Sequence, residues 1–233
     1  MFAVRKSNDR GHANHGWLDS KFSFSFADYY DPEFMGFRAL RVINEDVIQG
    51  GGGFGTHGHK EMEIVTYVLD GGIAHKDSIG SGGVITPGEL QHMSAGTGIR
   101  HSEYNASATT PAHMLQIWLL PSQRGITPTY SQQSFPIAAE HNQLHLLASP
   151  EGTRNSLTWV TDANLYAAKL DSEVSVEHSF TTRKHGWLQV ARGSATVNGE
   201  SLEQGDGLAL SDEQKIAVQA GKEGAEVLFF ELG

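Results

Sequence analysis

The chain has 233 residues, of which 39% are hydrophobic and 19% are charged, so it is long enough to bury a substantial core. This composition excludes a mainly disordered protein and fits one large β domain or two domains of about a hundred residues each. The formal net charge of −10 argues against direct binding to nucleic acid or anionic lipid, because both carry negative phosphates. Binding to a protein that itself holds DNA is still allowed.

The sequence contains no cysteine, which rules out disulfides, thiol nucleophiles and thiolate metal sites. Its twelve histidines therefore make imidazole and carboxylate the main candidate metal ligands. Residues 1–17 lack the apolar run of a signal peptide, and the longest apolar stretch, 114–120, is too short to cross a bilayer. We expect a soluble cytoplasmic protein with no membrane association, and we take it to be a monomer.

Short apolar or alternating runs follow one another between glycine-rich turns, a pattern typical of all-β proteins. Asp70-Gly71-Gly72, Arg192-Gly193 and Asn198-Gly199 predict turns. The glycine run 50–53 precedes a strand pattern rather than a helix, so a phosphate-binding loop is not expected. The predicted strands, in chain order, are 39–48, 62–69, 72–77, 91–94, 100–104, 114–120, 144–148, 165–170, 187–191, 194–197, 207–211, 215–219 and 226–231.

The polar, proline-containing segment 121–136 predicts a linker, which divides the chain into domains at 1–130 and 131–233. A weak internal repeat relates the two halves: Ile64–Gly71 resembles Gly186–Gly193, and Ala112–Leu119 resembles Ala225–Leu232. We therefore expect an all-β protein of two tandem β-barrels with few short helices.

Two pairs of chemically active residues stand at strand spacing. His57 and His59 are two residues apart, as are His101 and Glu103, and such residues share one face of an extended strand. Together the pairs predict a site of three histidines and one carboxylate for a divalent transition metal, with Fe, Mn, Co, Ni, Cu and Zn all compatible. The competing interpretation is that each pair is ordinary surface decoration.

Gly51, His57-x-His59 and Glu63 resemble the first motif of the cupin superfamily, and His101 with Asn105 resembles the end of the second. The longer segments 11–20, 24–32, 53–71, 75–80 and 93–105 resemble the pirin family within that superfamily. The resemblance implies a bicupin, two double-stranded β-helix barrels, with one metal in the N-terminal barrel. It implies the ligands His57, His59, His101 and Glu103, and we expect Fe(II) first among the metals. Glu63 is expected beside the site rather than on the metal.

The repeat also predicts what the C-terminal barrel lacks. The positions equivalent to the four candidate ligands are occupied by side chains that do not bind metals in this setting: Ser179, Thr181, Val218 and Ala220. We therefore expect no metal in that barrel. We also expect His178 and His185 to be exposed, and His75 and His113 to face solvent or a neighbouring strand.

Several aromatic and polar residues have two readings. Trp17, Phe22, Phe24 and Phe26 are expected to pack within the barrel. Met114, Gln116 and Trp118 share one strand face, which belongs either to the core or to a ligand pocket.

The resemblance extends to function. Bacterial pirins are associated with quercetin 2,3-dioxygenase activity, which opens the flavonol ring with dioxygen and releases carbon monoxide. On this hypothesis Glu103 is also the catalytic base for the flavonol hydroxyl. Two alternatives stay open: a metal-containing regulatory protein that binds a transcription factor or a metabolic enzyme, and a different metal-dependent cupin enzyme.

Overall fold

The computed structural model describes residues 2–180 and 182–233 and confirms the all-β prediction. The helices in this part of the chain are three short 3-10 turns: Ser7–Asp9, Pro136–Ala138 and Thr153–Asn155. None of the helices in the described ranges has the length and apolar run that a membrane crossing requires.

The chain divides into two compact units. The N-terminal barrel comprises Gly11–Ser134 with Trp159–Thr161, and the C-terminal barrel comprises Met1–Arg10, Phe135–Thr158 and Asp162–Gly233. The chain therefore begins in one unit, builds the other, and returns to the first.

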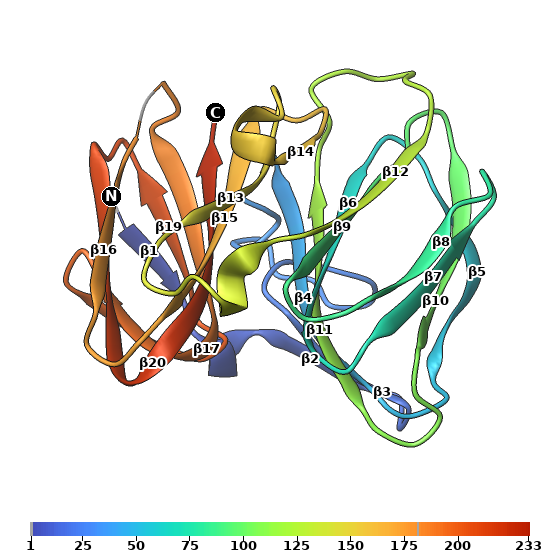
Figure 1. Cartoon of the computed structure of the whole chain (residues 1–233), viewed down its shortest axis with the longest axis horizontal. Helices are drawn as coiled ribbons and strands as arrows, with labels where there is room; N and C mark the ends of the chain where they lie inside the picture. The colour runs from blue at the N-terminus through green and yellow to red at the C-terminus, as the bar shows by residue number, and fades with distance from the viewer. Residues whose placement is uncertain (1, 181) are drawn as a thin grey trace. The chain divides into compact units, whose positions relative to one another are not determined.

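Two antiparallel sheets form the N-terminal barrel (Figure 1). The seven-stranded sheet has the order β12 (Thr129–Ser134), β9 (Glu89–Ser94), β6 (Glu63–Asp70), β11 (Ala112–Leu119), β4 (Leu40–Ile48), β3 (Leu18–Phe22) and β2 (Gly11–Asn14). The four-stranded sheet has the order β5 (Gly53–His59), β10 (Ile99–Asn105), β7 (Ile73–Asp77) and β8 (Gly82–Ile85).

Burial along the strands explains how the barrel forms. β6 is buried at every residue except its last, which suits a central strand covered on both faces. β10 alternates instead: Ile99, His101, Glu103 and Asn105 are buried, while Arg100 and Tyr104 face outward. This alternation places three polar side chains inside the barrel: His101, Glu103 and Asn105.

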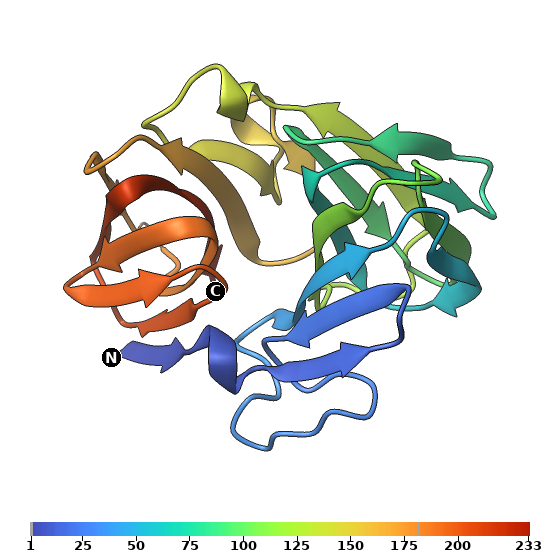
Figure 2. The same cartoon turned by 90° about the horizontal axis from the view of Figure 1, so that it is seen from below.

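A single sheet builds the C-terminal barrel. Its order is β1 (Phe2–Arg5), β19 (Gly207–Ser211), β17 (His185–Val197), β20 (Lys215–Leu232), β15 (Ala163–Leu170), β13 (His145–Ser149) and β14 (Leu157–Thr158), with β16 (Ser175–Ser179) on β20 and β18 (Glu200–Glu203) on β17. Its core packs leucine, valine and Phe229 from these strands. Figure 2 shows the dark-blue β1 beside the orange-to-red strands, and β1 pairs residue by residue with β19.

The predicted strands between residues 39 and 120 all occur, with ends shifted by one or two residues. The turn predicted at Arg192-Gly193 is wrong, because β17 and β20 run through as long strands. Bulges between Val190 and Arg192 and between Gly193 and Ala195 absorb the positive φ of Gly193. The glycine therefore bends the strand instead of reversing it.

The linker predicted over 121–136 contains a strand, β12, which pairs with β9 over six residues. Its side chains are polar and only half-buried, so its composition resembles that of a loop. The backbone ladder does not depend on that composition, because every non-proline residue carries its own donor and acceptor. Other short strands at the edges of sheets, such as β1, β2 and β8, also escaped prediction, because each has only four residues and so shows little periodic pattern.

Candidate metal and substrate site

Three histidines converge where β5 pairs with β10. His101 lies opposite His57, and Ile99 lies opposite His59. The three imidazole centroids are 4.5 to 4.8 Å apart. A β-bulge opposite His101 and Glu103 places one extra β5 residue between Phe54 and His57, which brings Phe54 opposite Glu103. The predicted pairing of His57, His59 and His101 is therefore found in space.

The histidine nitrogens are free to act as ligands. His57 Nδ1 lies 2.8 Å from the Gly55 carbonyl, which accepts its proton and leaves Nε2 with a lone pair. His101 Nε2 is buried and has no hydrogen-bond partner in the protein. One nitrogen from each of the three rings lies within 4.8 Å of the other two. This spacing fits a single ion bound between them.

Burial keeps two of these rings neutral. It lowers the pKa of His59 to about 4, with a further contribution from His57. It lowers the pKa of His101 to about 3, helped by the neighbouring His57, His59 and His75. At neutral pH both imidazoles therefore present a lone pair rather than a positive charge.

Glu103 lies two residues beyond His101 and points into the same barrel. Its carboxylate accepts hydrogen bonds from Thr66 Oγ1 at 3.1 Å and from Gln116 Nε2 at 3.1 and 3.3 Å. Burial raises its pKa. The nearby His75 and the hydrogen bonds from Gln116 and Thr66 oppose only part of this rise. Glu103 forms a second group of potential ligands with His75 and His101, again within 4.8 Å. His101 is common to both groups.

Glu63 belongs to a different cluster. It accepts hydrogen bonds from His92 Nε2 at 2.7 Å, Ser94 Oγ at 2.6 Å and the Val160 amide at 3.3 Å. Burial alone would raise its pKa, but these donors outweigh burial and hold the pKa below its ordinary value. Because both oxygens are already bound, the carboxylate ties β6 to β9 and to the returning chain.

A cavity of about 880 Å³ opens in front of the histidines. Trp17, Phe22, Phe26, Phe54 and Trp118 supply its aromatic wall. The polar part of the lining includes Asn44, Asp46, Glu103 and Gln116. Its size and lining are typical of a site for a small aromatic ligand.

The cavity extends one prediction and decides another that was left open. Phe22 and Phe24 are buried and Trp17 packs against the core as expected, and Trp17, Phe22 and Phe26 also line the cavity. Gln116 and Trp118 line the cavity, and Met114 packs in the core. In a barrel, the inward face of one strand serves the core at one level and the pocket at another.

Asp46 was not foreseen. It lies on the inward face of β4, lines the cavity and accepts a hydrogen bond from Ser20. Burial raises its pKa to about 7, and the charges of Glu103 and Glu45 act in the same direction against the Ser20 hydrogen bond. The signal in the sequence is the polar run Asn44-Glu45-Asp46, which interrupts the apolar pattern of this strand.

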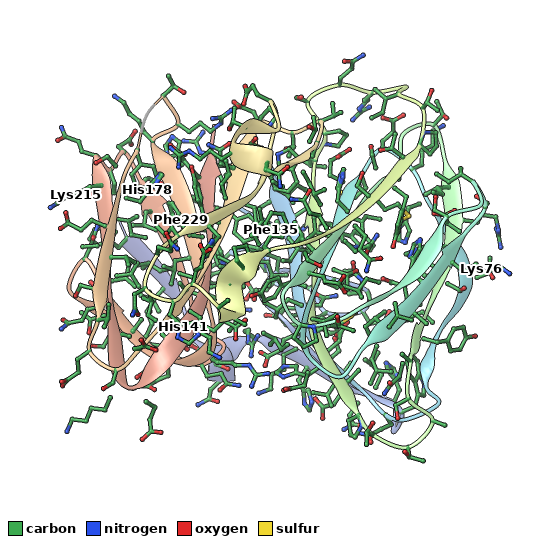
Figure 3. The ribbon with its side chains drawn as sticks, in the orientation of Figure 1. Lys76, Phe135, His141, His178, Lys215 and Phe229 are labelled. Atoms are coloured by element: carbon green, nitrogen blue, oxygen red, sulfur yellow. The ribbon has the colours of Figure 1, made fainter. Side chains whose placement is uncertain are left out.

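His75 takes the second of its two expected placements. It is buried beside Asp77, and its Nδ1 lies 3.4 Å from His101 Nδ1 on the neighbouring strand β10. His113 also faces a neighbouring strand, where it contacts Glu45 at 3.0 Å. His178 and His185 are half-buried rather than exposed. His178 contacts Glu231 at 3.5 Å and packs on Phe229 (Figure 3). Strand pairing covers these rings in a way that sequence spacing does not show.

The C-terminal positions equivalent to the ligands differ in burial. Val218 and Ala220 are buried and apolar, Ser179 is exposed, and Thr181 lies outside the described residues. Among the described residues, the groups of three or more side chains suited to a metal all lie in the N-terminal barrel.

Two β-barrels in one chain, one with a histidine cluster facing an internal cavity, define a two-barrel protein of the cupin class. Residues 3–119 match the Pirin family, and residues 146–232 match the quercetinase C-terminal cupin domain. The chain belongs to the pirin family.

Known proteins are similar to this chain over nearly its whole length. A protein of Escherichia coli K12 named quercetin 2,3-dioxygenase is 53% identical over 233 residues, covering all of this chain and 99% of the relative. A pirin-like protein of Caulobacter vibrioides is 40% identical, covering 96% of this chain and 97% of its own. A bacterial pirin from Escherichia coli crystallised in complex with nickel(II) superposes with a TM-score of 0.94 at 50% identity, covering 100% of this chain and 99% of that one.

Proposed function

We propose that this protein is a metal-dependent dioxygenase that opens the flavonol ring of quercetin, consuming dioxygen and releasing carbon monoxide. The observation that carries the proposal is the cluster of His57, His59 and His101 at the end of an aromatic cavity of about 880 Å³. The Escherichia coli relative named quercetin 2,3-dioxygenase supports the choice of substrate.

We assign four ligands: His57, His59, His101 and Glu103. The three imidazoles and the carboxylate form a mixed nitrogen and oxygen set suited to a divalent transition metal. We propose Fe(II) as the native ion, and the nickel(II) complex of the related pirin supports a site that accepts several such ions. A bound divalent ion would supply a Lewis acid that stabilises the anion of the flavonol.

The side chains of the chain then have distinct tasks. The aromatic wall, including Phe54 and Trp118, holds a flat ring system by stacking and excludes water. Glu103 accepts the proton of the flavonol 3-hydroxyl, and burial makes it a stronger base than an exposed carboxylate. Thr66 and Gln116 hold the carboxylate in place through their hydrogen bonds.

The test is reconstitution of the apo protein without oxygen with Fe(II), Mn(II), Co(II), Ni(II) or Cu(II), followed by quercetin decay and carbon monoxide release in air. We expect metal-dependent turnover by the wild type and loss of both metal and turnover in His57→Ala. Glu103→Gln should lower turnover more than it lowers metal content.

Tight metal binding without turnover by any ion would contradict the dioxygenase proposal. It would shift the assignment to the alternative of a metal-containing regulatory protein. Full metal content in His57→Ala would contradict the ligand assignment itself.

A further inference from the structure

Strand β7 carries an acid–histidine pair that the proposed reaction does not use. His75 and Asp77 are two residues apart and both side chains are fully buried, whereas Lys76 between them points outward (Figure 3). Across the strand pair, Asp77 lies opposite His101 and His75 lies opposite Glu103. The pair is therefore held directly against two of the proposed ligands.

The backbone fixes the Asp77 carboxylate. Its Oδ1 accepts hydrogen bonds from the amides of Ile79 at 3.0 Å and Ser81 at 2.8 Å, in the turn that leaves β7. Its Oδ2 lies 3.2 Å from His75 Nε2. A carboxylate held in this way can only accept on the side that faces His75. The proton of His75 is therefore on Nε2.

The tautomer of His75 determines the tautomer of the neighbouring ring, His101. With its proton on Nε2, His75 presents a lone pair at Nδ1, which lies 3.4 Å from His101 Nδ1. Two lone pairs facing each other would repel, so His101 carries its proton on Nδ1 and donates it to His75. Tyr130 stacks on His75 with a centroid distance of 4.8 Å and an interplanar angle of 26°, which fixes the plane of the His75 ring.

The remaining nitrogen of His101 is Nε2, the buried atom that has no partner in the protein. We propose that Asp77 and His75 are positioning residues that hold His101 in the tautomer with a free Nε2 lone pair, ready to bind the metal. The inference rests on the proposed role of His101 as a ligand. It does not depend on quercetin being the substrate. Partners of this kind around a ligating histidine fix its tautomer and strengthen its basicity.

Asp77→Asn tests the chain of hydrogen bonds with a sharp expectation. The amides of Ile79 and Ser81 still need an acceptor, so the asparagine oxygen stays with them and its NH₂ group faces His75. His75 must then accept at Nε2 and donate from Nδ1. His101 in turn must accept at Nδ1, which moves its own proton to Nε2.

The first measurement is long-range ¹⁵N–¹H NMR of the histidine rings in the apo protein at pH 7. We expect the wild type to show the His101 proton on Nδ1 and Asp77→Asn to show it on Nε2. The matched control is Glu45→Gln, the same change at the half-buried His113–Glu45 pair, which should leave His101 unaltered. A wild-type His101 proton on Nε2 would overturn the proposal, even if Asp77→Asn fails to fold.

The second measurement is a calorimetric titration of the apo proteins with Ni(II) alone. Asp77→Asn should bind about 10- to 100-fold more weakly than the wild type, and Glu45→Gln should match the wild type. Unchanged affinity in Asp77→Asn would contradict the proposal. So would a metal-bound signature on His75 Nδ1 in the zinc-loaded wild type, because His75 would then be a ligand itself. Absence of quercetin turnover would leave both measurements intact.

Discussion

Two carboxyl groups, Asp46 and Glu103, share one cavity, and burial raises the pKa of each. Like charges close together in a buried site cannot both ionise easily. Asp46 therefore keeps its proton into the neutral range, where an ordinary aspartate has lost it. At pH 7 the cavity holds less negative charge than its residue types suggest.

The free energy of unfolding of the apo protein should fall as the pH rises, because the pKa of Asp46 is raised in the folded state. The folded-state pKa of Asp46 is about 7 against a reference of 3.8, so between about pH 4 and pH 7 the folded protein keeps a proton that the unfolded chain has released. The stabilising contribution of protonated Asp46 is fully present below about pH 4 and is lost as the pH rises through about 7. The free energy of unfolding of Asp46→Asn does not fall with this proton. Relative to the wild type it should therefore rise over this range, by as much as about 4 kcal/mol.

Urea unfolding of both apo proteins from pH 4 to pH 8 measures the difference. A ¹³C NMR titration of the Asp46 carboxyl provides the direct check, with an expected midpoint near 7. A stability difference that stays constant with pH, or a midpoint near 4, would contradict the expectation.

The sequence predicted the residues whose relation is local. His57 with His59, and His101 with Glu103, are two apart, and the period of a strand is enough to place each pair on one face. His75 and Asp77 have the same spacing but were not recognised, because their importance comes from lying opposite Glu103 and His101 on β10. That register depends on the pairing of separate strands, which spacing along one strand does not contain.

At the level of elements, strands with apolar interiors were predictable and edge strands were not. β6 and β11 are buried on both faces over most of their length, so their apolar composition alone marks them. The long strands β17 and β20 were each predicted as two pieces, because glycine marks a bulge and a turn alike. Only the neighbouring strand decides which of the two forms.

The bulge at Gly193 should be intolerant of a side chain. Its φ is +69°, and a Cβ there would lie 2.1 Å from the Gly224 carbonyl oxygen, which is backbone and cannot move aside. Gly199 is the matched control, because its φ is +92° but nothing lies within 4 Å of its Cβ position. We expect Gly199→Ala to cost about 1 kcal/mol of stability for the backbone alone, and Gly193→Ala to cost several kcal/mol.

Thermal and urea unfolding of the two variants measure these costs, and metal content should equal that of the wild type in both. Equal losses in the two variants would show that the contact with Gly224 is relieved elsewhere.

For the whole molecule, the two barrels are related in design and unequal in chemistry. The all-β, two-barrel architecture could be predicted, because the repeat and the turn spacing recur along the entire chain. The membership of residues 2–10 could not, since β1 pairs with a strand about 200 residues away. Long-range pairing leaves no local trace in the sequence.

The inequality of the barrels predicts one metal ion per chain. Val218 is buried and apolar where the repeat places a ligand in the other barrel. Val218→Ala should therefore lower stability by about 1–3 kcal/mol through the cavity it leaves, with no change in metal stoichiometry. Elemental analysis after reconstitution checks this, with His101→Ala as the variant expected to lose the ion. Loss of metal in Val218→Ala would contradict an empty second barrel.

The pairing of β1 with β19 also sets an order of events during synthesis. Phe2–Arg5 leaves the ribosome about 200 residues before Gly207–Leu210, its partner segment. At about 5–20 residues per second, the first strand waits roughly 10–40 s with its edge unpaired. Once residue 134 has been made, the site-bearing barrel lacks only residues 159–161, whereas the other barrel closes only after β19 and β20 have been made. During this interval the residues of the proposed metal site are already present while β1 is still unpaired. Its free edge can then bind chaperones or pair with strands other than β19.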